Sequence, residues 1–263
     1  MIMILAASAL AISSTFLWSN HPPKPSVEQI NQSTLDILIL SEQILWRVKT
    51  ERSTDSVEQS LSALSMNSLV SGLTNDRSRK TFWINIYNAW YQILATREHM
   101  KRPEIFTKQM IPIAGKFFSL DDIEHGILRK YRSKYSLGYL PQLFPSKTIK
   151  QLAVSEIDFR IHFALNCGAR SCPPIAFYTY HDIDQQLETA TTSFLRSETE
   201  IDTKNKRVRV SKILQWFKGD FNGTSGIRTI LSTYLPGDFH DYLISYKDYN
   251  WDAQLANFRE AEK

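Results

Sequence analysis

The two cysteines of the chain flank a short loop in the segment NCGARSCPP, as Cys167 and Cys172. A cysteine thiolate is a strong nucleophile when a neighbouring cation or base lowers the pKa of the thiol. Cys167 precedes Gly168 and Ala169, whose backbone N–H groups can bind an oxyanion, and Arg170 favours the thiolate. Cys172 precedes a proline and is held in an extended turn. The sequence predicts Cys167 as the nucleophile, and a Cys167–Cys172 disulfide is the alternative in an oxidising compartment.

A histidine is expected to serve as the general base for this thiol. Residues 157–165 alternate as a strand, with apolar side chains on one face. The other face carries the polar residues Asp158, Arg160, His162 and Asn166. Strict alternation directs His162 away from Cys167, so His125 on the preceding helix is the preferred base and His162 the second choice.

The helix predicted over residues 121–132 carries a carboxylate on its apolar side. Ser119 and Asp122 resemble a capping box that begins the helix. At about 100° per residue, Glu124 falls within the arc of leucine and isoleucine side chains. A buried carboxylate needs a partner or a chemical role, so we expect Glu124 to pair with an Asn, with Arg160 or with a His. Either Glu124 or Asn85 would then orient the catalytic base.

A stripe of uncharged polar side chains follows the helix predicted over residues 79–97. The stripe contains Thr81, Asn85, Asn88 and Gln92, which are three or four residues apart and therefore share one face. Such amides on an otherwise apolar helix are buried and must be hydrogen-bonded, either to loops of the protein or to a ligand. The predicted binding residues are Asn88, Gln92, Arg160, Asn166, Arg170 and Cys172.

Metal binding is a competing interpretation of the same residues. His162, Cys167 and Cys172 with Glu124 or His125 would supply suitable ligand atoms. Their spacing matches neither a C-x-x-C nor an H-E-x-x-H pattern, so we predict no metal and no cofactor. The signatures of serine hydrolases, P-loops and dinucleotide-binding folds are also absent from the sequence.

The elements that must position these residues are predicted from periodicity. Helices are expected at residues 27–50, 79–97, 121–132, 182–196, 212–217 and 226–234. Strands are expected at residues 110–113, 116–118, 157–165, 207–210 and 243–246. Because strands and helices do not alternate strictly, the fold class is α+β, a single domain of helices around a small, mainly antiparallel sheet.

The composition and the N-terminal segment bear on location and partners. The 263 residues include 31 Lys plus Arg and 27 Asp plus Glu, a net charge of +4 that gives nucleic-acid binding no support. Residues 1–25 resemble a signal peptide or anchor followed by a Pro-rich linker, although no basic residue precedes the apolar run. We expect the domain over residues 26–263 to be periplasmic or otherwise extracytoplasmic, secreted or tethered to the membrane.

A basic stretch separates Glu124 from Glu156. It contains no acidic residue, but six Lys and Arg residues lie there among tyrosines and a phenylalanine, at positions 129, 130, 132, 134, 147 and 150. The stretch is expected to be a solvated face or to contact an anionic envelope polymer or a lipid headgroup.

Three segments give the chain a family resemblance. WINIYN (residues 83–88), SLDDIEHGILR (residues 119–129) and RIHFALNCG with SCP (residues 160–173) resemble, in that order, the signature blocks of the domain of unknown function 547 family. The resemblance extends over residues 79–251, counting YKDYNW near the C-terminus. It implies no settled activity, and it carries a distant likeness to papain-like or transglutaminase-like thiol enzymes.

Together these observations predict an envelope protein with thiol-dependent acyl or amide chemistry. Its unknown substrate would be an envelope polymer or a peptide. The alternative is a non-catalytic binding or scaffold module in which Cys167 and Cys172 are disulfide-bonded.

Overall fold

Helix α4 (Asp76–Thr96) is the central element of the fold. Its side chains from Phe82 to Leu94 are all buried, because the stretch contains no charged residue. The N-terminus of α4 is closed by a capping box between Asn75 and Ser78. The computed structural model describes residues 30–260, so the predicted export segment and linker over residues 1–25 lie outside the described residues.

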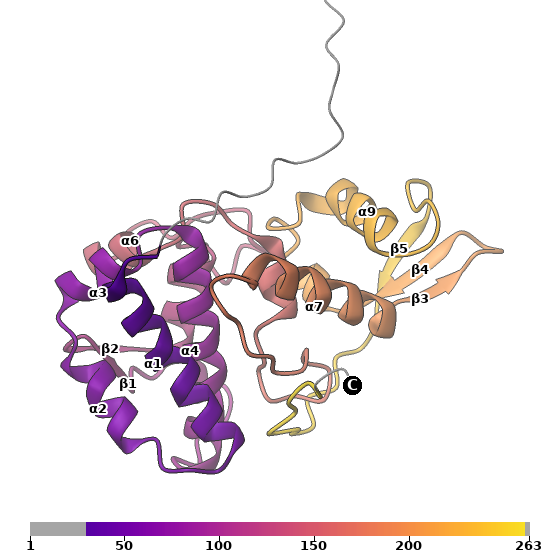
Figure 1. The fold of residues 1–263 in the computed structure, drawn as a ribbon. Helices are drawn as coiled ribbons and strands as arrows, with labels where there is room; N and C mark the ends of the chain where they lie inside the picture. Colours follow the sequence, from indigo (N-terminus) through magenta and orange to yellow (C-terminus); the bar gives the residue numbers. More distant parts are fainter. Residues whose placement is uncertain (1–29, 261–263) are drawn as a thin grey trace, which may run out of the picture. The chain divides into compact units, whose positions relative to one another are not determined.

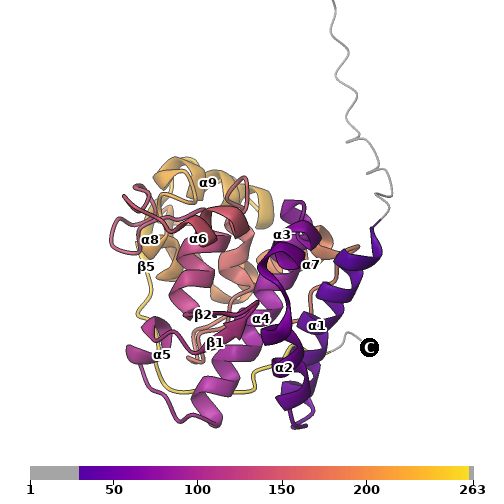
Figure 2. The ribbon, with the colours of Figure 1, turned by 90° about the vertical axis from the view of Figure 1, so that its left-hand side faces the viewer.

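Helix α1 (Gln32–Lys49) covers one side of α4, and two further helices from the first part of the described chain pack against α1. Figures 1 and 2 both show α1 and α4 side by side. Helices α2 (Asp55–Ala63) and α3 (Met66–Gly72) pack against α1. The helix predicted over residues 27–50 contains all of α1, which begins at Gln32. The sequence did not predict α2 or α3.

Within residues 30–260, the strands form two small sheets. β1 (Ile111–Ile113) and β2 (Lys116–Phe118) form an antiparallel hairpin. β4 (Arg207–Val210) pairs antiparallel with β3 (Glu200–Asp202) and parallel with β5 (Leu243–Tyr246). The α+β class with mainly antiparallel pairing is therefore confirmed, although the strands form two sheets.

A hydrophobic core joins the second sheet to the C-terminal helices. It is formed by α7 (Ile183–Glu198), α8 (Ile213–Trp216) and α9 (Gly223–Tyr234) together with β4. Its members include Phe163, Phe194, Val208, Leu214, Phe221, Ile227 and Leu231. These helices begin and end within a few residues of the predicted bounds. Two short helices, α5 (Glu104–Thr107) and α6 (Lys147–Leu152), were not predicted.

Two helical segments differ from the predicted geometry. η1 (Asp122–Leu128) is a π-helix, in which Arg129 N–H donates to the Glu124 carbonyl at 2.9 Å. The predicted exchange of hydrogen bonds between Ser119 and Asp122 is present. The predicted strand over residues 157–165 is wrong, since η2 (Phe159–Phe163) is a 3₁₀ helix. Its three residues per turn replace the strict alternation on which the predicted direction of His162 depended.

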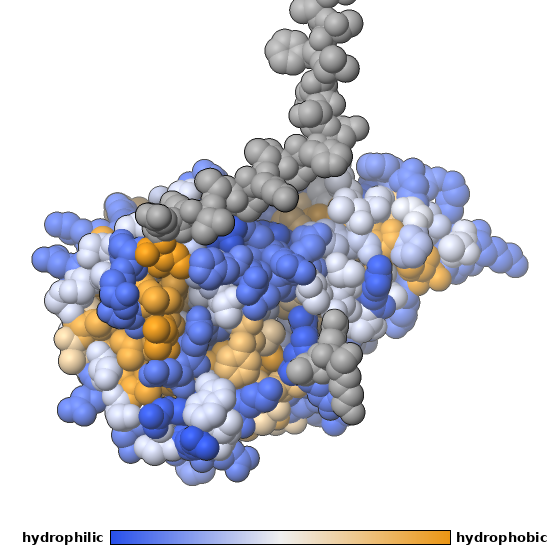
Figure 3. All heavy atoms as spheres, viewed as in Figure 1, coloured by the Kyte–Doolittle hydropathy of each residue, from blue (hydrophilic) through white to orange (hydrophobic). Residues whose placement is uncertain are grey.

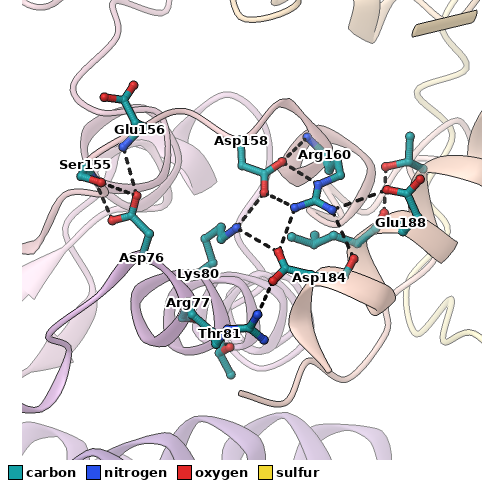
Figure 4. A network of polar contacts seen from close by, with 12 residues as sticks. Asp76, Arg77, Lys80, Thr81, Ser155, Glu156, Asp158, Arg160, Asp184 and Glu188 are labelled. Atoms are coloured by element: carbon teal, nitrogen blue, oxygen red, sulfur yellow. Dashed lines mark hydrogen bonds and ion pairs between the residues drawn. The ribbon is translucent and has the colours of Figure 1, made fainter. Parts of the chain in front are cut away.

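An ion-pair network joins η2 to α4 and α7 (Figure 4). Lys80 of α4 lies 2.7 Å from Asp158, and Arg160 binds both Asp158 and Asp184 of α7. Burial alone raises the pKa of Asp158, but the Arg160 hydrogen bond and the Lys80 charge outweigh it and hold the pKa well below its usual range. Arg160 therefore fixes the packing of η2.

The surface is mostly hydrophilic on the face seen in Figure 3, with an apolar band on the side of α1, α2 and α3. Leu35 and Ile39 of α1 are among the exposed apolar residues. Within residues 30–260, none of the helices combines the length and the apolar character needed to cross a bilayer.

Candidate functional site

A cavity of about 270 Å³ brings together several of the predicted site residues. Its wall is contributed by α4, η1, η2, α8 and the C-terminal segment. Lining residues include Tyr87, Phe106, Glu124, His125, His162, Cys167, Trp216, Phe217, Tyr249 and Trp251. A mostly apolar cavity with a few convergent titratable groups is typical of a ligand or active site.

Cys167 and Cys172 are joined by a disulfide, with Cα atoms 6.0 Å apart. Neither sulfur is a free thiol in this state. The Tyr249 hydroxyl lies 3.2 Å from Cys167 Sγ and 3.1 Å from Cys172 Sγ. Burial raises the pKa of Tyr249, and the nearby Glu124 charge adds to this effect. Tyr249 therefore keeps its proton beside the two sulfur atoms.

Glu124 is largely but not fully buried in the cavity wall, with its side chain 13% exposed. Its partner is the Tyr87 hydroxyl, which donates to Oε2 at 3.1 Å. Burial raises the pKa of Glu124 to about 7, and the positive charge of Arg129 only partly opposes this. The side chain is mostly removed from water, as expected. Tyr87 is not among the expected partners, because a tyrosine fits the apolar face of α4 and does not stand out in its pattern.

His125 lies beside Glu124 but does not present a basic nitrogen. Arg129 Nη1 lies 2.7 Å from His125 Nδ1, and a guanidinium can only donate, so Nδ1 accepts and the ring proton is on Nε2. Burial lowers the pKa of His125 well below its ordinary value, and the Arg129 charge lowers it further. This geometry does not support the prediction of His125 as the general base.

His162 is held by a carboxylate and an aromatic ring, and burial lowers the pKa of its imidazole below the ordinary value. Its Nε2 lies 2.9 Å from Asp220 Oδ2, and its ring stacks on Phe217 at 4.1 Å between centroids. Asp220 also accepts from the buried Arg129, whose Nε lies at 2.5 Å. Asp220 is ionised, because the hydrogen bonds from His162 and Arg129 outweigh the effect of burial and lower its pKa. The carboxylate therefore fixes the proton on Nε2 and leaves the lone pair on Nδ1.

An aromatic cluster forms another side of the cavity. The ring centroids of Tyr249 lie 4.8 Å from Trp216 and 4.6 Å from Trp251. The guanidinium of Arg102 stacks over Trp251 at 4.6 Å from the ring centroid. These flat side chains offer a stacking surface for an organic ligand.

Comparison with known proteins identifies the family. The model of the family described as "Protein of unknown function, DUF547" matches residues 70–195. This segment belongs to the DUF547 family. No curated protein and no solved structure matches the chain. The resemblance was expected over residues 79–251, but the match ends at residue 195. Trp216, Asp220 and Tyr249 of this DUF547 protein therefore lie beyond the matched segment.

The amide stripe of the DUF547 protein binds its own backbone. Asn85 exchanges two hydrogen bonds with the backbone of Tyr178. Asn88 Nδ2 donates to the Ala164 carbonyl and its Oδ1 accepts from Asn166 N–H, while Gln92 Oε1 accepts from Ala256 N–H. Asn85 does not line the cavity, so the structure does not support its expected role in orienting a base. The stripe instead fixes the segments that carry Cys167 and the C-terminus.

Three further expectations for the cysteine loop are corrected. Gly168 N–H donates to Asn166 Oδ1 at 2.9 Å and is not free to bind an oxyanion. Asn166 is buried and also donates to the Pro173 carbonyl. Arg170 is exposed and is not among the residues that line the cavity. Among residues 30–260, no three His, Cys, Asp or Glu side chains form a metal-binding group.

Sequence reasoning missed several residues of the site. Arg129 belongs to the SLDDIEHGILR segment, and Tyr249 and Trp251 belong to the YKDYNW segment. The family resemblance of these two segments is the signal that points to the three residues. Asp220 follows a lysine and a glycine between two short helices, where no periodicity marks it.

Proposed function

We propose that this DUF547 protein catalyses thiol-dependent hydrolysis or transfer of an acyl or amide group in the cell envelope. Cys167 is the nucleophile, His162 the general base and Asp220 the residue that orients the base. The observation that carries the proposal is that Cys167 and the Asp220-bound His162 line one cavity. This matches the logic of nucleophile, base and orienting carboxylate.

The reaction begins with reduction of the Cys167–Cys172 disulfide by a dithiol, which is itself oxidised to a disulfide. The Cys167 thiol then gives its proton to His162 Nδ1, and the sulfur forms a bond to the carbonyl carbon of the substrate. The bond from that carbon to the leaving group breaks, and His162 returns the proton to the departing atom. Water or an acceptor amine releases the acyl group from sulfur by the same sequence of steps.

Other cavity groups support this chemistry. The Tyr249 hydroxyl, within 3.2 Å of Cys167 Sγ, can donate to a thiolate there. Glu124, with a pKa raised to about 7 by burial, can hold or release a proton near neutral pH. The aromatic cluster provides a surface for the substrate. A peptide or an envelope polymer fits the stacking surface and the acyl chemistry.

Location in the envelope is supported by two observations. Disulfides persist in oxidising compartments, and the two cysteines of the chain form a disulfide with each other. The apolar N-terminal run followed by a Pro-rich stretch has the composition of an export signal or tether.

Acylation of the protein by p-nitrophenyl acetate tests the proposal. In Cys172→Ser, Cys167 cannot form the internal disulfide and should become acetylated, as detected by intact mass and peptide mapping. The matched control is Cys167→Ser with Cys172→Ser, which should not be acetylated at this loop. Adding His162→Ala to Cys172→Ser should slow acetylation by about 10²–10⁴-fold, the usual contribution of a general base. Equal acetylation in all three proteins would contradict the proposal.

The second candidate is a non-catalytic binding module of the envelope, and the disulfide itself favours it. In that case the Cys167–Cys172 bond is permanent and the cavity only binds. Thiol titration of the native exported protein with and without a dithiol distinguishes the two. A disulfide that resists reduction until the protein is denatured would favour the binding module.

A further inference from the structure

The loop between η1 and α6 exposes large apolar side chains to solvent. Phe144 is 94% exposed, Leu143 86% and Tyr135 85%. Leu140, Tyr139 and Leu137 of the same loop are 63%, 50% and 45% exposed. In Figure 2 this loop lies at the edge of the described chain, beside α8. Single exposed apolar residues are common, but six large apolar side chains exposed in one short loop indicate an interaction site.

The loop is held in place by hydrogen bonds. Ser133 N–H donates to the Leu140 carbonyl at 2.9 Å, and Gln142 N–H donates to the Tyr131 carbonyl at 2.7 Å. Gly219 N–H donates to the Leu137 carbonyl at 2.7 Å, which fastens the loop to the segment after α8. The apolar side chains are therefore presented on an ordered backbone.

The charged side chains of the loop and of α6 are all basic. No acidic residue occurs between Glu124 and Glu156. Lys130 pairs with Glu156 at 3.5 Å, and Lys134 with Asp121 at 2.5 Å. Lys147 and Lys150 of α6 are exposed and form no ion pair with another described residue, and Arg132 forms only a hydrogen bond to a carbonyl. A partner for this surface must combine apolar groups with negative charge.

We propose that residues 132–150 dock onto the surface of an anionic phospholipid bilayer. Leu143, Phe144 and Tyr135 enter the headgroup boundary, where leucine and aromatic side chains bind favourably, and Lys147 and Lys150 face lipid phosphates. A soluble anionic polymer would leave Phe144 and Leu143 in water. A second copy of the chain would place like-charged loops against each other.

Docking in this way has a consequence for the cavity. Lys134 belongs to the loop and also lines the cavity. The loop residue Gly138 packs so closely against Asp220 that a Cβ at this position would lie 2.4 Å from Asp220 Oδ1. The bilayer surface would then lie near the rim of the cavity. The proposal does not depend on the chemistry proposed for Cys167.

The test places a fluorescent reporter in the loop, so that membrane binding through the N-terminal segment alone cannot give the expected signal. A tryptophan is placed at the tip by Phe144→Trp and, as the matched control, on β2 by Phe117→Trp, where the native side chain is 64% exposed. Each full-length variant is mixed with phosphatidylglycerol–phosphatidylcholine vesicles that carry brominated acyl chains. The tryptophan emission is compared with that of the parent protein.

The proposal predicts quenching and a blue shift for the Phe144→Trp signal and neither for Phe117→Trp. Adding Lys147→Ala and Lys150→Ala should raise the lipid concentration needed for half-maximal quenching by about fivefold for each cation removed. Equal signals for both tryptophans, or quenching that is unchanged on pure phosphatidylcholine, would overturn the proposal. Binding to soluble polyglutamate without quenching by vesicles would also overturn it, in favour of a polymer partner.

Discussion

Replacing Glu124 by glutamine should change how the stability of the protein depends on pH. In the native protein burial raises the pKa of Glu124 to about 7, while its ordinary value is 4.5. Between these values the folded state holds a proton that the unfolded state has lost. The stabilisation from this group is therefore complete below about pH 4.5, falls as the pH rises, and is lost above about pH 7. At about 1.36 kcal/mol per pKa unit, the difference amounts to about 3 kcal/mol.

Glutamine does not titrate and can still accept the hydrogen bond from Tyr87. Relative to the native protein, Glu124→Gln should therefore gain about 3 kcal/mol in free energy of unfolding between about pH 4.5 and about pH 8. Urea unfolding followed by circular dichroism at both pH values measures this. Glu156→Gln is the matched control, because it makes the same chemical change at a carboxylate that is 87% exposed and therefore stays hydrated in the folded protein. If the two variants behave alike, Glu124 is not a desolvated carboxylate.

Two further substitutions test the packing around the cavity. Asp220→Ala leaves the buried guanidinium of Arg129 without its carboxylate and should lower the free energy of unfolding by about 3–5 kcal/mol in urea titrations. The control Glu200→Ala, in an exposed pair, should cost about 0–1 kcal/mol. Similar losses in the two variants would refute the assigned burial of the Asp220 pair. In the same assay, Gly168→Ala should lower the free energy of unfolding by about 1–3 kcal/mol more than Gly115→Ala. Both glycines have positive φ, but only at Gly168 would a Cβ lie 2.2 Å from the Tyr91 ring. Equal losses would show that Tyr91 moves freely.

The sequence predicted best those elements whose conformation follows from hydrophobic periodicity and composition, without long-range contacts. The helices α1, α4, α7 and α9 and the hairpin of β1 and β2 were predicted from these patterns, and the α+β class followed. The 3₁₀ helix η2 was mistaken for a strand because its phenylalanine and isoleucine residues alternate with polar ones. Its conformation is decided by tertiary contacts, among them the ion pairs of Arg160 with Asp158 and Asp184.

The site was predicted in outline, but its hydrogen-bonding partners were not. Glu124, His162 and Cys167 were identified by residue type and position, and they line one cavity. Asp220, which orients His162, comes from a loop far away in the sequence. Arg129 Nη1 donates to His125 Nδ1, four residues earlier in the chain, and the sequence pattern gave no sign of this pairing. Pairings of this kind are determined by the folded chain.

The central claim is that His162 activates Cys167, and the pH dependence of alkylation tests it most directly. In Cys172→Ser the chain holds one thiol, so the rate of its reaction with iodoacetamide reports on Cys167 alone. We predict a thiolate pKa below the ordinary value of about 8.5, and a return to about 8.5 when His162→Ala is added. A pKa near 8.5 in both proteins, or no labelling without denaturant, would contradict the account.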